Sequence, residues 1–362
     1  MKKIYLGLQF LFATICFGQA GSPALPYYNN FNWSLTGTSL KTALANKLIS
    51  KHTNFLSYTP GVWEASKVTD LDPNNSNNVL LIYGWENGTD SNVTNDLSRN
   101  KNSNGGDPGE WNREHVFAKA LGNPTLEDDA PSDAGEDAHH IRSSDVTRNN
   151  SRGSLKFAPG SGNSQTVTGG WYPGDQWKGD VARMMMYMYL RYGSQCLPTY
   201  VATGTTVSTD TNMVSLLLQW NAEDPVSVYE DNRNTYHGNT TTNAYAQGNR
   251  NPFIDNPYLA TLIWGGPAAE NRWPTTILES DIFEYVSVDI YPNPTNNNKI
   301  NINSTIDIDS IQLININGQL IMEINNPDDN NKNFTIDNLE KGFYFVKLNN
   351  EQQVITRKII VN

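Results

Sequence analysis

The stretch Trp111-Asn112-Arg113-Glu114-His115-Val116-Phe117 decides the expected fold and site, because it places a carboxylate directly beside an imidazole in a polar setting. A second polar cluster follows at Asp137-Ala138-His139-His140-Ile141, and the chain then runs on to Asn149-Asn150-Ser151-Arg152-Gly153. Together the three segments hold a general base, hard oxygen ligands for a divalent cation and an arginine. Hydrolysis of a phosphodiester needs these groups, so the pattern predicts a nuclease.

Four side chains in these segments have distinct chemical roles. His115 can take a proton from water near neutral pH. Glu114 and the side-chain oxygen of Asn149 are hard ligands that suit Mg²⁺, with Ca²⁺ or Mn²⁺ as alternatives. Arg152 can form a fork to a non-bridging phosphate oxygen. We therefore predict that His115 and Arg152 are catalytic. Glu114 and Asn149 are the predicted metal ligands.

The pair His139-His140 leaves two interpretations open. A zinc site would need His115 or an acidic residue to complete its ligands, and no His-x-x-x-His or Cys pair supports it. We favour a supporting role for the pair. One imidazole would hydrogen-bond to the groups around the metal and the other would pack inside the protein, with Arg142 nearby. A zinc-dependent hydrolase stays an alternative function. An inactive relative or adhesin is another, although the presence of both Glu114 and His115 argues against it.

The amino-acid composition limits how tightly the protein is expected to bind nucleic acid. The 362 residues carry 26 Lys and Arg against 37 Asp and Glu, a net charge of −11, which argues against tight non-specific adhesion to nucleic acid. A nuclease needs only a local positive groove, so this charge does not exclude one. We expect DNA as substrate, with RNA as a further one. Because one site per chain suffices for the chemistry, we expect a monomer.

Residues 1–20 have the pattern of an export signal. A short basic start is followed by an apolar run at 4–17 and a small-x-small cleavage signal that ends at Ala20. No later stretch approaches the roughly 20 apolar residues that span a bilayer, so we expect export without stable membrane insertion. Once Cys16 leaves with the signal, Cys196 is alone and is expected to be a small buried hydrophobic residue.

Helix and strand patterns alternate after the signal, so residues 21–280 are predicted to form one α+β domain with several helices. The spacing of Leu40, Leu44 and Leu48 predicts an early helix, and the methionines near residue 185 are expected to be core. The other expected elements are a buried strand at 79–83, helices at 181–192 and 213–220, and a helix that begins at Asp224-Pro225 with Asp224 as its cap.

The composition changes near residue 280, and residues 286–362 are rich in Asn and Ile with short alternating strands. Turn signals such as Asn317-Gly318 separate these strands. About 75 residues of this kind predict a small all-β sandwich. The segment contains no His, no Cys and no acid–base cluster, so we do not expect it to be catalytic.

This tail resembles the C-terminal sorting domain of proteins exported by the type IX secretion system of Bacteroidetes. The matching segments are Ile290-Tyr291-Pro292-Asn293-Pro294-Thr295, Ile316-Asn317-Gly318-Gln319, Leu339-Glu340-Lys341-Gly342-Phe343-Tyr344-Phe345-Val346 and Lys358-Ile359-Ile360-Val361. The resemblance implies an address read by the type IX secretion machinery. It implies a protein that is secreted or held at the cell surface.

The central motifs resemble the bacterial endonuclease I family of ββα-metal (His-Me finger) nucleases. The matching segments are Asn112-Arg113-Glu114-His115, Asp137-x-His139-His140-Ile141-Arg142, Asn149-x-x-Arg152-Gly153, Trp220-Asn221 with Asp224-Pro225-Val226, and Gln247 to Asp255. The family implies a one-metal mechanism with His115 as base and with Glu114 and Asn149 on Mg²⁺. It implies cleavage of DNA, and often RNA, with little sequence preference, leaving 5′-phosphate ends.

The chain departs from the family at two loop positions. Ala118 stands where many members have proline after the Glu-His pair, and Ser143 replaces a proline after the second cluster. Neither change removes a ligand. A second phosphate-binding arginine is not evident between the clusters, and Arg142 and Arg148 are the candidates by proximity alone.

Overall fold

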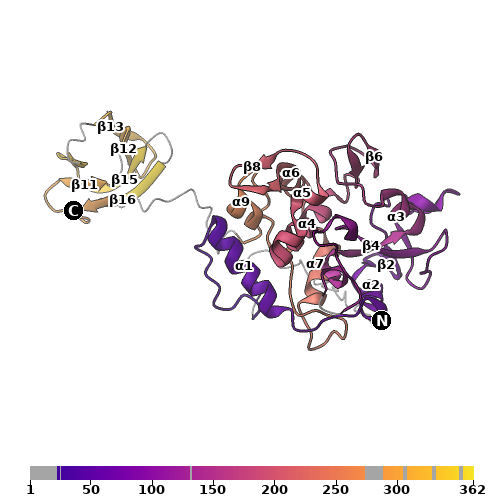
Figure 1. Cartoon of the computed structure of the whole chain (residues 1–362). Coiled ribbons are helices and arrows are strands. Elements are labelled where there is room, and N and C mark those ends of the chain that lie inside the picture. Colours follow the sequence, from indigo (N-terminus) through magenta and orange to yellow (C-terminus); the bar gives the residue numbers. More distant parts are fainter. Residues whose placement is uncertain are drawn as a thin grey trace, which may run out of the picture. The chain divides into compact units, whose positions relative to one another are not determined.

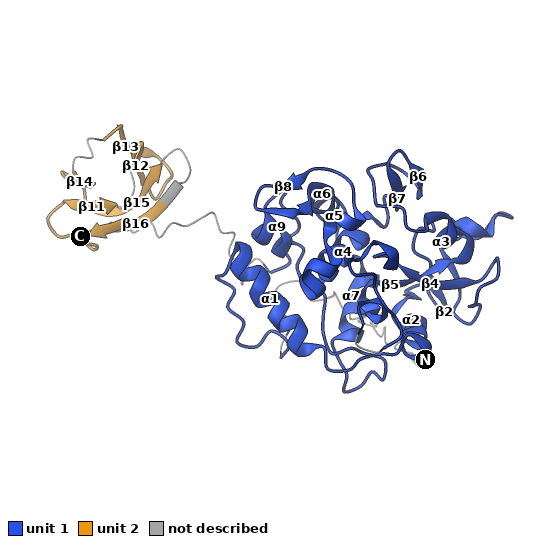
Figure 2. Cartoon of the chain, viewed as in Figure 1, with its two compact units in different colours: residues 1–279 blue, residues 280–362 orange. Residues whose placement is uncertain are grey.

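The chain forms two compact units, Met1–Glu279 and Ser280–Asn362, in this computed structural model (Figure 2). The structure describes residues 23–24, 26–130, 133–273, 288–304, 308–327, 332–349 and 354–362. The expected export signal at 1–20 lies outside the described residues. No helix in the described part of the chain combines the length and apolar character needed to cross a membrane.

Helix α4 (Lys178–Tyr192) is the central helix of the first unit and packs against α1 (Gly37–Lys51) and α6 (Ser215–Glu223) (Figure 1). Its methionines are buried, as predicted for core positions. The described part of the unit also contains α2 (Trp63–Thr69), α5 (Pro198–Val201), α7 (Val228–His237), α8 (Pro252–Asp255), α9 (Tyr258–Trp264), a π-helical turn at Tyr58–Val62, and 3₁₀ turns at Val93–Asn95, Lys119–Leu121, Ala134–Glu136, Ala138–His140 and Gly193–Cys196. The predicted helix around Leu44 is therefore confirmed as α1, and Cys196 is buried as expected.

The strands of the first unit pair in small antiparallel sheets rather than in one large sheet. They are β1 (Leu71–Asp72) with β2 (Asn75–Leu80) and β3 (Ser98–Asn100), β4 (Trp111–His115) with β5 (Ile141–Asp145), β6 (Gln165–Val167) with β7 (Gly170–Tyr172), and β8 (Thr206–Val207) with β9 (Asp210–Val214). The helices supply most of the core, and the mixed α+β class is the predicted one.

Strands β4 and β5 lead directly into helix α3 (Val146–Arg152), which gives the ββα order that the resemblance implies. The register pairs Glu114 with Arg142 and His115 with Ile141. The carboxylate of Asp145 caps α3 by accepting a hydrogen bond from the Arg148 N–H at 2.9 Å, which satisfies one of the free donors at the helix start. The sharp strand-to-helix turn therefore depends on the residue at the end of β5.

Two helix starts differ from the prediction. Met213 and Val214 belong to strand β9, so α6 begins two residues later than expected. Helix α7 begins after Ser227, which forms a capping box with Glu230, and not at Asp224. The Asp224 carboxylate instead accepts a hydrogen bond from the Gly179 N–H at 2.8 Å. A reciprocal cap satisfies two backbone donors at once, and this favours the later start.

The second unit is the predicted all-β sandwich. One sheet has the order β10 (Val288–Tyr291), β11 (Ile300–Ser304), β14 (Asn333–Ile336), and the other has the order β13 (Leu320–Asn325), β12 (Ser310–Asn315), β15 (Gly342–Asn349), β16 (Val354–Val361). Both sheets contribute to one core, which includes Ile302 from the first sheet and Leu313 and Val346 from the second.

Candidate active site

Glu114 is a buried carboxylate at the end of β4, with 3% of its surface exposed. Its Oε1 accepts a hydrogen bond from the Tyr83 hydroxyl at 2.9 Å and lies 3.2 Å from Nη1 of Arg152. Burial raises the pKa of Glu114 to about 7, and Arg152 and Tyr83 oppose that rise. Both contacts fall on Oε1, so within the described residues Oε2 remains available to a ligand.

The imidazole of His115 is oriented by a backbone carbonyl. Its Nε2 lies 2.8 Å from the carbonyl oxygen of Gly135. Because a carbonyl can only accept, Nε2 carries the proton and Nδ1 keeps its lone pair. The ring stacks on Tyr58 with centroids 5.4 Å apart. Burial, with a contribution from His140, lowers the pKa of His115 to about 3, so the ring is neutral at neutral pH.

Helix α3 brings Asn149 against β4. The Nδ2 group of Asn149 donates to Oδ1 of Asn112 at 2.8 Å and approaches the carbonyl of Arg113 at 3.4 Å, which is the peptide oxygen next to Glu114. The amide nitrogen is thus engaged, and Oδ1 is left as an acceptor. Carboxylate and amide oxygens, completed by water and phosphate, form a donor set that fits a hard divalent cation such as Mg²⁺.

The position of Arg152 differs from the predicted phosphate contact. Its side chain is fully buried, and the guanidinium donates to the carbonyls of His115 at 3.0 Å and Val116 at 2.8 Å while it faces Glu114. A cation in this position compensates the buried carboxylate and fixes the end of β4. It does not extend outward to a substrate, so the structure favours a positioning role over direct catalysis.

The three residues that were predicted to support the metal ligands lie in different surroundings. The Nε2 of His140 donates to the carbonyl of Ala134 at 2.9 Å, and its ring lies 5.6 Å from that of His115. His139 points to a different region, where its Nε2 lies 3.2 Å from the carbonyl of Asn249. Arg142 belongs to a buried ionic cluster and lies 3.1 Å from Asp180. Of these three residues, His140 alone has a ring contact with His115.

The zinc alternative lacks a ligand set. Across residues 26–130, 133–273 and the described strands of the tail, no three His, Cys, Asp or Glu side chains converge as ligands. The buried ring of His139 packs instead against Tyr187 at 4.6 Å and against His237 at 4.8 Å. The pair His139-His140 is therefore split between two packing environments.

Two site residues were missed by the sequence analysis. Tyr83 follows β2 and has a φ of 74°, a conformation that bulky residues rarely adopt. That geometry accompanies the hydroxyl contact with Glu114. Gly135 contributes only a carbonyl, and a backbone group leaves no residue-type signal in a sequence. The apolar run that predicted the strand at 79–83 gave no indication of a polar role for its last residue.

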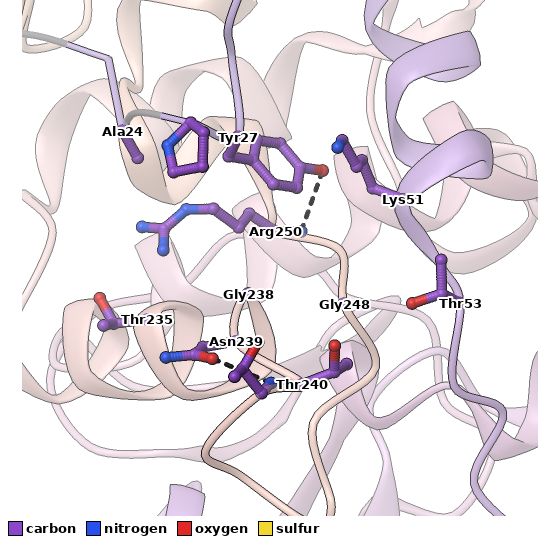
Figure 3. Close-up of a pocket in the computed structure, with 12 residues that line it drawn as sticks. Ala24, Tyr27, Lys51, Thr53, Thr235, Gly238, Asn239, Thr240, Gly248 and Arg250 are labelled. Carbon is purple, nitrogen blue, oxygen red and sulfur yellow. Dashed lines mark hydrogen bonds between the residues drawn. The ribbon is translucent and has the colours of Figure 1, made fainter.

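A hollow of about 540 Å³ lies away from these residues, between the end of α1 and the end of α7 (Figure 3). Its lining includes Tyr27, Lys51, Asn239 and Arg250, and none of the predicted site residues. Arg250 is already bound to Asp255, whose oxygens lie 2.5–3.0 Å from its guanidinium nitrogens. The arginine in this hollow is therefore largely neutralised.

Comparisons with known proteins support both resemblances. Residues 36–258 match the Endonuclease I family, and residues 289–362 match the secretion system C-terminal sorting domain. The extracellular ribonuclease of Bacillus amyloliquefaciens is 42% identical over 239 residues, which cover 63% of this chain and 75% of that protein. The extracellular ribonuclease of Bacillus subtilis (strain 168) is 41% identical over 258 residues, which cover 67% and 82%.

A solved structure of PorZ, a surface component of the type IX secretion system of Porphyromonas gingivalis, aligns with 21% of this chain and 11% of its own. The TM-score is 0.18 and the identity 13%, which is too low to indicate a shared fold. The sorting domain and the extracellular relatives confirm the predicted localisation, which is secreted or at the cell surface. With its family match over 36–258 and its tail match over 289–362, the chain belongs to the endonuclease I family and carries a C-terminal sorting domain.

Proposed function

We propose that this secreted nuclease is a metal-dependent endonuclease that hydrolyses phosphodiester bonds of RNA and DNA with little sequence preference. Both relatives are named extracellular ribonucleases, and this supports RNA as a substrate. The family as a whole supports an endonucleolytic cut. Cleavage of the bond to the 3′-oxygen leaves 5′-phosphate ends.

The observation that carries the mechanism is the hydrogen bond from His115 to the carbonyl of Gly135 at 2.8 Å. It holds the proton on Nε2, so Nδ1 is the atom that accepts a proton from the attacking water. The stacked ring of Tyr58 limits rotation of the imidazole. His115 is thus proposed to be the general base, acting through Nδ1.

Glu114 and Asn149 would hold the cation through Oε2 and Oδ1, the oxygens left free by the contacts described above. Mg²⁺ suits this set best, with Ca²⁺ or Mn²⁺ as substitutes. When bound, such a cation supplies neutralisation of the charge that develops on phosphate oxygens and leaving group. Arg152 keeps Glu114 in place and favours its ionised form, and is assigned here as a positioning residue.

Digestion of supercoiled DNA and of single-stranded RNA, with and without EDTA, tests this function. We expect cleavage of both that EDTA stops and Mg²⁺ restores. The His115→Ala variant should lose cleavage by at least about 100-fold, because general-base catalysis contributes roughly 10²–10⁴-fold. Its fold, measured by circular dichroism, should be retained. Full activity of the His115→Ala variant, or full activity of the wild type in EDTA, would contradict the proposed mechanism.

A further inference from the structure

A polar pocket of about 290 Å³ lies on the flank of the helix that carries Asn149. Helix α3 contributes Thr147, Arg148 and Ser151 to its wall. These residues are spaced by three and four positions and share one helix face, whereas Asn149 and Arg152 share the face that meets β4. One short helix therefore separates the candidate active site from this pocket.

The remaining wall of this α3 pocket combines indole rings with hydroxyl groups. Trp85 and Trp171 line it, together with Thr94, Ser164, Gln165 and Thr166. The guanidinium carbon of Arg148 lies 4.4 Å from the centroid of the half-buried Trp85 ring. Among the lining residues Arg148 alone carries a charge, so the pocket is locally basic in a chain whose net charge is −11.

Two groups in the α3 pocket have unused hydrogen-bonding capacity. Arg148 is fixed by Nε, which donates to the Thr94 carbonyl at 2.9 Å, and by Nη1, which is 3.2 Å from Ser164. No described residue bonds its Nη2. Trp171 is 2% exposed, and its indole N–H has no partner in the described part of the chain. A buried donor without a partner costs free energy in the free protein.

The α3 pocket is also linked to the site through Tyr83. The Ser164 hydroxyl donates to the Tyr83 carbonyl at 2.6 Å, and the Tyr83 hydroxyl contacts Glu114 at 2.9 Å. Trp171 packs edge-on against Tyr83 with centroids 5.6 Å apart. A helix with its side chains is about 10–12 Å wide. A nucleic-acid strand therefore needs only a few nucleotides to reach from the candidate active site to the α3 pocket.

We propose that the α3 pocket binds one unpaired nucleotide of the substrate strand, with its base against Trp85 and its phosphate at Arg148 and the neighbouring hydroxyls. Stacking is largely independent of base identity because every base has a π face, and it adds affinity to a chain of net charge −11 without further positive charge. The volume of about 290 Å³ lies just below the roughly 300–1,000 Å³ typical of ligand sites, so a single nucleotide is the expected occupant. This inference rests on the proposed nuclease function and adds a preference for single strands.

Binding by the full chain tests the inference without the complication of cleavage. In a His115→Ala background, Trp85→Ala should raise the Kd for a short labelled single-stranded RNA by about tenfold, the usual effect of removing one stacked base. The Kd for the same sequence as a duplex should not change. Fluorescence anisotropy measures both. An unchanged Kd for the single strand, or an equal loss for the duplex, would overturn the inference.

Kinetics separate binding in the pocket from chemistry at the site. With His115 intact, Trp85→Ala should raise KM for single-stranded RNA and leave kcat close to that of the wild type. Hydrolysis of bis(p-nitrophenyl) phosphate, which is too small to reach the pocket, should be unchanged. Loss of that small-substrate activity would mean that the Trp85 ring supports the site itself, and this would also overturn the inference.

A second variant covers the case in which Trp85→Ala fails to fold. Ser151 is exposed, and Ser151→Trp should fill the pocket and raise KM for single strands without removing a buried contact. Thr240→Trp, which places the same side chain in the hollow of Figure 3, is the matched control and should leave KM unchanged. Equal KM values in Ser151→Trp and the wild type would refute the pocket's role. If the wild type cleaved no nucleic acid at all, the proposed function itself would fail.

Discussion

Nη1 of Arg152 lies 3.2 Å from Oε1 of Glu114, so a fully buried cation from α3 faces the carboxylate at the end of β4. Arg152→Ala would leave that carboxylate buried and uncompensated. We expect a loss of about 3–5 kcal/mol in the free energy of unfolding, as is usual when one partner of a buried pair is removed. Urea denaturation measures the change.

Lys67→Ala provides the control for this prediction, because it removes a partly exposed surface pair with Glu64 and should cost less than about 1 kcal/mol. Arg152→Lys should recover only part of the stability, since an ammonium group cannot reproduce the planar fork that reaches two carbonyls and a carboxylate. A cost for Arg152→Ala as small as that for Lys67→Ala would contradict the assigned role.

Adjacent asparagines in α3 allow a matched test of the cation site. Asn149→Ala removes the amide oxygen proposed as a ligand, and Asn150→Ala alters an exposed neighbour. We expect the first variant to need at least about tenfold more Mg²⁺ for half-maximal cleavage, by analogy with the roughly 10–100-fold effects of altering groups around a metal. The second variant should need the same Mg²⁺ concentration as the wild type for half-maximal cleavage. Identical Mg²⁺ midpoints for Asn149→Ala and the wild type would show that Asn149 is not a metal ligand.

Gly135 is a backbone position on which the orientation of His115 depends. A Cβ there would lie 2.2 Å from the carbonyl oxygen of Glu127, so Gly135→Ala must displace the turn. Because a misplacement of about 1 Å can cost roughly 100-fold in rate, we expect kcat to fall at least tenfold. Gly106→Ala meets no atom within 4 Å and is the control. Normal kcat in Gly135→Ala would show that this carbonyl is dispensable.

The buried histidines predict a loss of stability in acid. Burial lowers the pKa of His139 and of His140 to about 4, and it also lowers the pKa of His52, His115 and His237. Groups with folded-state pKa values below their unfolded value near 6.5 take up protons preferentially in the unfolded chain. Their contribution to stability is therefore complete above pH 6.5 and is lost as the pH falls toward about 4.

Burial also raises the pKa of Asp180 and of Glu114 to about 7, and these groups act in the opposite direction. It raises the pKa of Asp96, Glu136 and Asp224 by smaller amounts. The five histidines outweigh the two carboxyl groups whose pKa rises furthest, so the unfolded chain should bind more protons than the folded one between pH 7 and pH 5. The free energy of unfolding should then fall by about 1.4 kcal/mol per pH unit for each excess proton. Unfolding by urea at pH 7 and pH 5 in EDTA, which keeps metal out of the comparison, measures it. Equal or greater stability at pH 5 would be inconsistent with neutral buried imidazoles.

Local signals in the sequence were sufficient for several elements. The spacing of apolar residues predicted α1, and alternation predicted the strands of the tail, because each pattern reflects burial of one side of an element. The methionine-rich run predicted α4, which is buried on all sides from Gly179 to Leu190. The polar motif at Glu114 and His115 predicted where the candidate site lies. Its position at the end of a strand that pairs with β5 agrees with the ββα order expected from the family.

Long-range packing explains what could not be predicted. The role of Arg152 depends on which face of α3 meets β4, and the sequence of a seven-residue helix does not specify that. Arg142 looked like a phosphate ligand by proximity, but it lies in a buried cluster with Asp180, a residue on another helix. The start of α7 was misplaced because Asp224-Pro225 is also a cap signal, and only the contact with Gly179 shows where that carboxylate is used.

The carbonyl partner of His115 has a consequence for the conditions in which this protein works. A peptide oxygen neither ionises nor gains or loses charge with acidity, unlike the aspartate that orients histidine in many hydrolases. The tautomer of His115 is therefore set by a contact that is indifferent to the ionic strength and acidity of the medium. For a protein released into surroundings that the cell does not buffer, such an arrangement keeps the lone pair of the neutral imidazole on Nδ1 wherever the turn at Ala134–Glu136 stays folded.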